Sequence, residues 1–197
     1  MIAYKGVTKD MIASQGRGEK KLEVGKTYTE ARSKTANSGW HCTENPLDCL
    51  RYFPLGADNR YFLVKAAGDI DEDDFQRIAC TEITLIQELS IGAMAFEAMK
   101  YIINHPHRDR WEQTGRNLSV KKDRAYVTKP GSIAIARGKN PVVSGPLGSF
   151  LGLIQEEKPG QIGIAKLFSP TAKEAGKWFT VTPDRKLVEV TDEEEIN

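Results

Sequence analysis

The stretch Tyr61-Phe62-Leu63-Val64-Lys65-Ala66 decides the fold of the first half of the chain. It is apolar except for its lysine, which is typical of a central strand covered on both faces. A second strand is expected from Cys80 to Leu89, because Ile83 and Leu85 alternate with polar residues there. These two segments predict a mixed or antiparallel sheet.

Two helices are expected beside this sheet. Asn45 is a good cap for a short helix that begins at Pro46 and ends before Pro54. Ser90 caps a longer helix from Ile91 to about Asn104, whose apolar residues cover more than one face. The sheet and the two helices predict an α+β domain over residues 1–112.

The second half changes in character and predicts a β-rich region over residues 113–197. Ser132–Gly138 is a run of small residues, and Gly131, Gly138 and Gly145 recur every seven positions. This spacing predicts a short β-roll or β-helix-like solenoid, with an ordinary meander as the alternative. Open edges of such a segment favour a homo-oligomer. Thr180–Val188 predicts a closing β-hairpin.

Bulk composition excludes several classes of protein. The 197 residues are 40% hydrophobic and 28% charged, with a net charge of +1, which is typical of a globular protein without a general attraction to nucleic acid or membrane. Three cysteines are an odd number and argue against a disulfide scaffold. The start of the chain has no signal-peptide pattern, and the apolar stretch Ile91–Ile103 is too short to span a bilayer. We therefore expect a cytoplasmic protein.

Charge is unevenly distributed along the chain. Residues 67–97 contain eight acids against Arg77 alone, whereas residues 116–139 contain seven bases against Asp123 alone. The two blocks could attract each other within a chain or between copies. The interpretation as two solvated faces is favoured, because charge runs usually face water.

Three local patterns are partly similar to a zinc site, a cysteine nucleophile with its base, and a calcium loop. None of them has the arrangement of residues that its site requires. His41-Cys42 with Cys49 lacks the paired ligand spacing of a zinc site. Adjacent residues on an extended chain face opposite sides, so His41 cannot activate Cys42 directly. The acidic repeat 69–73 lacks the glycine and the glutamate that a calcium loop requires. No metal and no cofactor are expected.

The segment His105–Trp111, together with the basic block of residues 116–139 that follows it, is the strongest ligand-binding candidate that the residues themselves offer. Its cations could hold phosphates, while Trp111 or Tyr126 could stack on a base. No glycine-rich phosphate loop precedes a helix. The candidate residues are Arg108, Arg110, Trp111, Arg116, Lys121, Lys122 and Arg124.

An ordered set of short motifs along nearly the whole chain resembles an uncharacterised family of phage and prophage proteins. The resemblance implies a β-solenoid in the glycine-paced segment and gives no catalytic residues. The motifs are Tyr4-Lys5-Gly6, Glu23–Tyr28, Ser38–His41, Glu44–Asp48, Gly68-Asp69-Ile70, Gly131–Gly138 and Gly145–Gly148.

The first half is also faintly similar to ADP-ribosyltransferases. Tyr4, His41 and Tyr52 follow the order of their NAD-binding residues, although Tyr4 or Lys5 stands where those enzymes have Arg or His. This resemblance implies that Tyr4, His41 and Tyr52 bind a ligand.

The function expected from these observations is binding rather than catalysis, since no set of side chains is spaced to perform a reaction. We expect a small phage-encoded protein that acts in the host cytoplasm. It would inhibit a host defence component, in the manner of an anti-CRISPR, by binding a host bacterial protein or a nucleotide or nucleic-acid signal. The alternatives are an NAD-using ADP-ribosyltransferase and a structural virion accessory protein.

Overall fold

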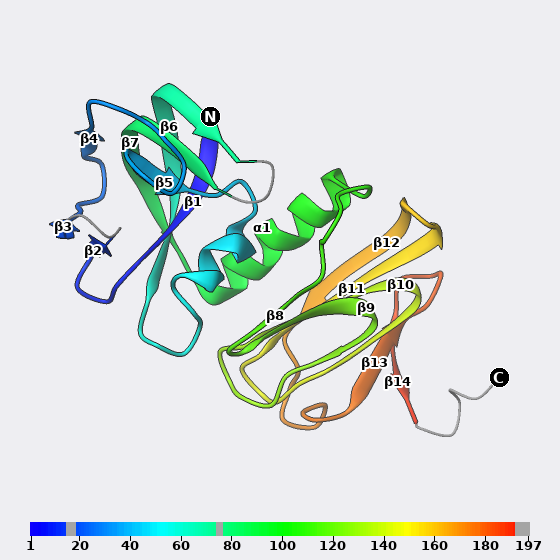
Figure 1. Ribbon diagram of the computed structural model, residues 1–197. Coiled ribbons are helices and arrows are strands. Elements are labelled where there is room, and N and C mark those ends of the chain that lie inside the picture. Colours follow the sequence, from blue (N-terminus) through cyan, green and yellow to red (C-terminus); the bar gives the residue numbers. More distant parts are fainter. Residues whose placement is uncertain (15–18, 74–76, 192–197) are drawn as a thin grey trace. The chain divides into compact units, whose positions relative to one another are not determined.

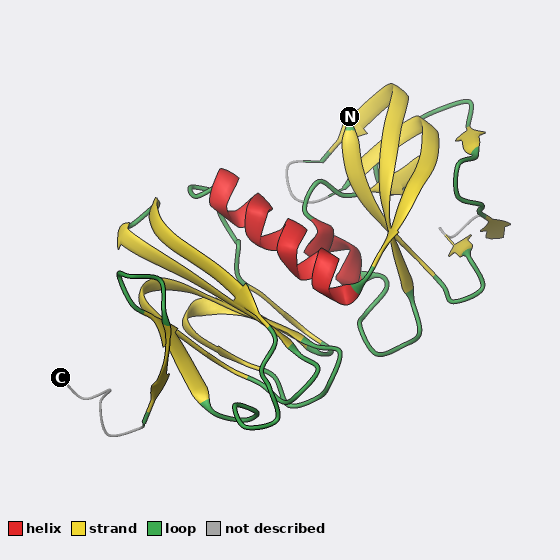
Figure 2. Ribbon diagram, turned by 180° about the vertical axis from the view of Figure 1, so that it is seen from behind, coloured by secondary structure: helices red, strands yellow, loops and turns green. Residues whose placement is uncertain are grey.

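The structure is a computed structural model that describes residues 1–14, 19–73 and 77–191. The chain forms two compact units, Met1–Met94 (unit 1) and Ala95–Asn197 (unit 2). Strand residues outnumber helical residues in both units, as Figure 2 shows in yellow, and account for 51% of the described residues, against 11% in helices.

The predicted α+β class, with two helices in the front half, is therefore wrong. In the described ranges only α1 (Ile91–Asn104) reaches seven residues, and it lies in the middle of the chain. The segment after Asn45 forms a six-residue 3₁₀-helix, η1 (Pro46–Arg51), in which Asn45 Oδ1 accepts a hydrogen bond from Leu47 N. Proline on both sides leaves too few residues for a longer α-helix.

Unit 1 is built from antiparallel strands. β6 lies between β1 and β7, as its apolar run predicts, and β4 and β5 pair in succession along the other edge of β7. β2 and β3 form a separate hairpin. The strands are β1 (Ile2–Val7), β2 (Ile12–Ser14), β3 (Glu19–Lys21), β4 (Thr27–Thr29), β5 (Trp40–Cys42), β6 (Arg60–Glu72) and β7 (Ile78–Leu89) (Figure 1).

The two ends of the unit 1 sheet are joined to each other. Tyr4 N donates to Thr43 O at 2.7 Å, and Thr43 N donates to Tyr4 O at 2.8 Å, which links β1 to the residue after β5. The sheet thereby curls around a core to which Phe62, Val64 and Cys80 contribute. Burial of such apolar side chains is the main source of stability for a sheet of this size.

Unit 2 contains the second large sheet, in the order β12-β11-β10-β13-β14, with β9 on β10 and β8 on β9. β9 and β11 run parallel to β10, and the remaining pairs are antiparallel. Its core includes Ala134, Val143, Leu151 and Val181. The strands are β8 (Gln113–Gly115), β9 (Leu118–Tyr126), β10 (Ile133–Ser144), β11 (Phe150–Lys158), β12 (Gln161–Phe168), β13 (Trp178–Val181) and β14 (Leu187–Val190).

The predicted β-solenoid is also wrong, because unit 2 is a mixed sheet without solenoid closure. The evenly spaced glycines have different local roles. Gly131 has a φ of 66°, as a turn requires, whereas Gly138 lies within β10, where a Cβ would meet the carboxylate of Asp123. A Cβ on Gly145 would meet the hydroxyl of Ser149. Gly138 and Gly145 therefore make room for neighbouring side chains, and of the three only Gly131 turns the chain.

Candidate functional site

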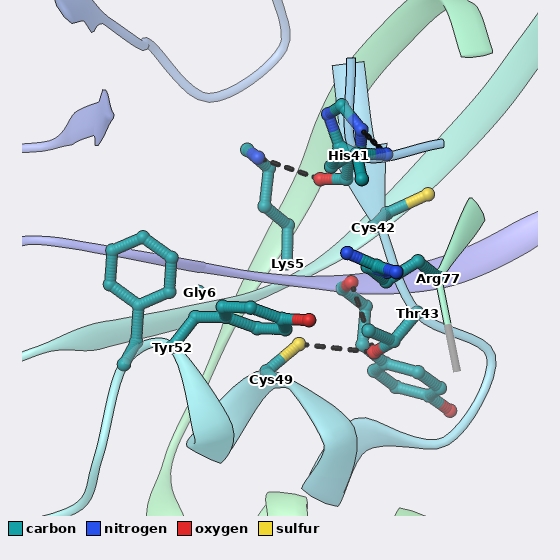
Figure 3. A pocket seen from close by; sticks show the side chains of 11 residues that line it. Lys5, Gly6, His41, Cys42, Thr43, Cys49, Tyr52 and Arg77 are labelled. Carbon is teal, nitrogen blue, oxygen red and sulfur yellow. Dashed lines mark hydrogen bonds between the residues drawn. The ribbon is translucent and has the colours of Figure 1, made fainter. Parts of the chain in front are cut away.

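Unit 1 contains a pocket between β1, η1 and the start of β7, which we call the β1 pocket. It holds about 430 Å³ of empty space, counting its open mouth. The lining residues, drawn in Figure 3, are Tyr4, Lys5, Gly6, Ala36, His41, Cys42, Thr43, Cys49, Tyr52, Phe53 and Arg77.

The two faces of β1 have different neighbours. Ala3 and Val7 pack into the core of unit 1, so the alternation of the strand turns Tyr4 and Gly6 to the opposite face, where the pocket lies. A Cβ on Gly6 would lie only 2.6 Å from Cδ2 of Phe53. Tyr61 Oη donates to Phe53 O at 2.8 Å and holds this segment in place. Glycine at position 6 is therefore what allows Phe53 to form a wall of the pocket.

Thr43 and η1 fix the sulfur side of the pocket. Thr43 Oγ1 donates to Asn45 O at 2.8 Å and lies 3.2 Å from Sγ of Cys49. Burial raises the pKa of Cys49 to about 11, and contact with the Cys80 thiol together with burial raises the pKa of Cys42. Both groups therefore remain thiols near neutral pH, where the thiolate is the nucleophilic form.

His41 is held in one orientation by the loop before β5. Its Nε2 accepts a hydrogen bond from Ala36 N at 3.1 Å, so the proton of the neutral ring lies on Nδ1. Burial, and then the nearby Lys5, lower the pKa of His41 below its usual value. The ring is thus neutral near pH 7 and adds no positive charge to the pocket.

Lys5 is a buried lysine on the core side of β1, with only 2% of its surface exposed. Its Nζ donates to His41 O at 2.7 Å, and Figure 3 shows the side chain directed to this carbonyl rather than toward Tyr52. Tyr4, the residue before it, is joined to Thr43 through the backbone, and the amine of Lys5 adds a side-chain donor to this link between β1 and β5. Burial lowers the pKa of Lys5.

Arg77 and Tyr52 form the polar mouth of the pocket. Arg77 Nε donates to Asp73 Oδ2 at 2.6 Å, and Arg77 N donates to Asp73 Oδ1 at 2.8 Å. Asp73, and after it Tyr52, raise the pKa of Arg77, which therefore stays a cation. Tyr52 exposes 51% of its surface. An arginine held in a fixed position beside an accessible ring suits a planar anion.

The acidic block of the sequence secures the loop that forms one side of the pocket. Ser33 Oγ donates to Asp69 at 2.7 Å, while Thr35 N and Oγ1 donate to Asp71 at 2.7 and 2.8 Å. The hydrogen bonds to Asp71 lower the pKa of its carboxyl group to about 2, and the bond from the backbone N–H of Thr35 has the largest effect. The acids therefore hold residues 33–35, directly before Ala36, against β6.

The structure brings together three of the residues predicted to bind a ligand and separates the others. Tyr4, His41 and Tyr52 all line the β1 pocket. The basic candidates belong to unit 2, where Arg108 lies over Tyr101 and Arg124 over Trp178. Of the remaining candidates, Trp111 packs under Arg137, and Arg110, Arg116, Lys121 and Lys122 are exposed.

Sequence reasoning missed Lys5, Phe53 and Arg77 as pocket residues. Arg77 is the single base among the acids of residues 67–97, and this pattern could have predicted that it forms an ion pair with one of them. Nothing in the pattern around Lys5 indicated burial. Among the described lining residues there is no carboxylate, and nowhere in the described ranges do three His, Cys, Asp or Glu side chains gather to hold a metal ion.

Comparison with known proteins finds a similarity for the first part of the chain. Residues 1–97 match the family described as "Domain of unknown function (DUF7666)", so the match contains every residue of the β1 pocket. Nothing in it points to a phage origin or to ADP-ribosyltransferases. No curated protein and no solved structure matches the chain. Within residues 1–14, 19–73 and 77–191, no helix has the length and apolar character needed to cross a membrane.

Proposed function

We propose that the protein is a binding protein whose unit 1 takes a small planar anion of the nucleotide class in the β1 pocket. The observation that carries the proposal is the combination of aromatic walls and one fixed arginine in a pocket without a described carboxylate. Tyr4, Tyr52 and Phe53 supply flat apolar surface, and Arg77 supplies the charge. Rings of this kind stack on bases, and guanidinium groups bind phosphate.

The groups around the pocket support binding rather than reaction. Cys42 and Cys49 have raised pKa values and remain thiols, and His41 is neutral with Nε2 accepting from the backbone. Arg77 is ion-paired with Asp73 through Nε, and we propose that a ligand meets the rest of its guanidinium as the charged group of the pocket mouth. Nucleotide capture of this kind, in the host cytoplasm, is how we propose that the protein opposes a host defence component.

Calorimetric titration of the full chain with AMP, cyclic AMP and NAD tests the proposal. We expect one site per chain, and Arg77→Met should weaken binding by about ten-fold or more, because a hydrogen bond to a charged group is lost. Arg60→Met is the matched control, since Arg60 also binds a carboxylate of unit 1, Glu88, but lies outside the pocket. No heat with any nucleotide, or equal weakening by both substitutions, would exclude the proposal.

A second candidate function is transfer of ADP-ribose from NAD. One observation favours it: Tyr4, His41 and Tyr52, which follow the transferase order in the sequence, line one pocket. Incubation of the protein with labelled NAD and a bacterial lysate separates the two functions. Label on protein that disappears in a His41→Ala variant supports transfer, whereas NAD binding without transferred label supports binding alone.

A further inference from the structure

Unit 2 presents two aromatic side chains in one row on the outer face of its sheet. Ser144 of β10 pairs with Tyr126 of β9 on one side and with Trp178 of β13 on the other. The neighbouring residues Ala125 and Val143 belong to the core, and strand alternation therefore turns Tyr126, Ser144 and Trp178 to the other face of the sheet, where Tyr126 is exposed, Trp178 is half-buried and Ser144 is buried. We call this surface the Trp178 face.

The aromatic groups of the Trp178 face are accessible and are arranged with a cation. Tyr126 exposes 57% of its surface, and its ring meets that of Trp178 edge to face, with 6.1 Å between ring centroids. Arg124, two residues before Tyr126 on β9, lies with Cζ 3.8 Å from the Trp178 ring centroid. A ring that is left this exposed beside a stacked guanidinium is a platform for another flat group.

The surroundings of the face are basic. Residues 116–139 contain seven bases against Asp123 alone. Arg137 is used inside unit 2, because it is 3% exposed and binds Glu156, but Lys121, Lys122 and Lys129 are exposed on β9 or shortly after it. Clustered exposed bases attract a polyanion and release its counterions on binding.

We propose that the Trp178 face binds single-stranded nucleic acid. Bases stack on Tyr126 and on the guanidinium of Arg124, while Lys122, which lies on the same face of β9 as these two residues, contacts a phosphate. A single strand fits better than a duplex, because the platform needs base faces that a duplex keeps stacked inside. The site belongs to unit 2 and is independent of the β1 pocket, so either proposal can fail without the other.

Fluorescence anisotropy with the full chain and a labelled oligothymidine of about ten nucleotides tests this proposal, since such proteins cover about 4–16 nucleotides. Tyr126→Ala and Trp178→Leu should each weaken binding by about five-fold or more, the loss expected when one stacked base is released. Phe96→Ala is the matched control, because Phe96 is a comparably exposed ring (54%) under a cation, Lys100, on α1. Circular dichroism checks the fold of each variant, and Tyr126→Ala, which removes a largely exposed ring, keeps the test valid if Trp178→Leu unfolds.

The salt dependence of binding tests the proposed contacts between lysine and phosphate. Binding should weaken between about 50 mM and 200 mM salt, and Lys122→Gln should lower the slope of log affinity against log salt by about 0.7, the value for one lost phosphate contact. The proposal is overturned if the oligonucleotide does not bind, if Tyr126→Ala and Phe96→Ala bind equally well, or if a duplex of the same length binds as tightly. The proposal is also overturned if the chain is a dimer that binds no oligonucleotide and Tyr126→Ala converts it to a monomer. In that case the Trp178 face would be a contact between two copies of the chain.

Discussion

Unit 1 and unit 2 use charged side chains in opposite ways. In unit 1 the acids at positions 69, 71 and 73 bind groups of their own unit, and Lys5 is buried. In unit 2 most bases of residues 116–139 are exposed, and Arg124 lies over Trp178, whereas Arg137 forms an internal ion pair. A run of like charges in a sequence can thus form intramolecular hydrogen bonds and ion pairs in one unit and a proposed binding surface in the other.

The largest effect is expected from the internal ion pair of unit 2. The side chains of Arg137 and Glu156 are 4% and 15% exposed, so Glu156→Ala leaves a buried charge and should lower the free energy of unfolding by about 3–5 kcal/mol. Glu189→Ala is the control, because Lys177 and Glu189 are 46% and 44% exposed, and its cost should stay below about 1 kcal/mol. Urea unfolding measures both, and equal costs would contradict the contrast between buried and exposed charge.

Gly6→Ala should be the most damaging small substitution in unit 1. The added Cβ meets Phe53 at 2.6 Å, and overpacking of this kind costs about 1–3 kcal/mol. In unit 2, Gly115→Ala should be close to neutral, because the nearest atom, Cβ of Leu118, is 4.0 Å away. Thermal unfolding of both variants checks this, and a Gly6→Ala protein as stable as the Gly115→Ala protein would show that Phe53 does not depend on the glycine.

Lys5→Met should change how the stability of unit 1 depends on pH. Burial lowers the pKa of Lys5 in the folded state, so the folded protein binds fewer protons than the unfolded chain between that pKa and the ordinary value of 10.5. The free energy of unfolding of the wild type therefore rises with pH through this window, with a slope of up to about 1.4 kcal/mol per pH unit. Relative to Lys5→Met, the wild type should gain stability as pH approaches 10.5.

Denaturant unfolding at a series of alkaline pH values measures this difference. Lys65→Met, which removes an exposed lysine from β6, controls for the loss of one positive charge. A constant difference between wild type and Lys5→Met across the series would mean that Lys5 does not titrate differently on folding.

The smallest effect is expected at Asp71. Hydrogen bonds from Thr35 lower its pKa to about 2 in the folded state, so its contribution is complete above the ordinary value of 3.8 and is lost as pH falls toward 2. Asp71→Asn should remove this acid dependence and speed hydrogen exchange at the amide of Thr35. Unchanged exchange at Thr35, measured by NMR, would show that the carboxylate does not hold the loop.

Local patterns in the sequence were sufficient for some elements. The apolar run at Tyr61–Ala66 lies in β6, and the largely apolar segment from Ile91 to Asn104, predicted as a helix, coincides with α1. Both signals depend on residues that are close in sequence. The glycine spacing failed because the reasons for glycine at positions 138 and 145 are Asp123 and Ser149, side chains that only the folded chain brings near.

The candidate site was predictable only in part for the same reason. Tyr4, His41 and Tyr52 were named from their order in the chain, but their meeting depends on the long-range pair between Tyr4 and Thr43 and on η1. Arg77 reaches the pocket from the position directly before β7. Trp178 gave no signal by itself, because its partner Tyr126 lies two strands away across β10.

NMR titration of the isotope-labelled full chain with AMP, at about 200 mM salt to weaken phosphate contacts on the open surface, tests the central claim most directly. The account predicts that amide signals of residues 4–6, 36–43, 49–53 and 77 shift together, and that the Arg77→Met protein shows no such shifts. Shifts confined to the neighbourhood of Tyr126 and Trp178, or no shifts at all, would contradict a nucleotide site in unit 1.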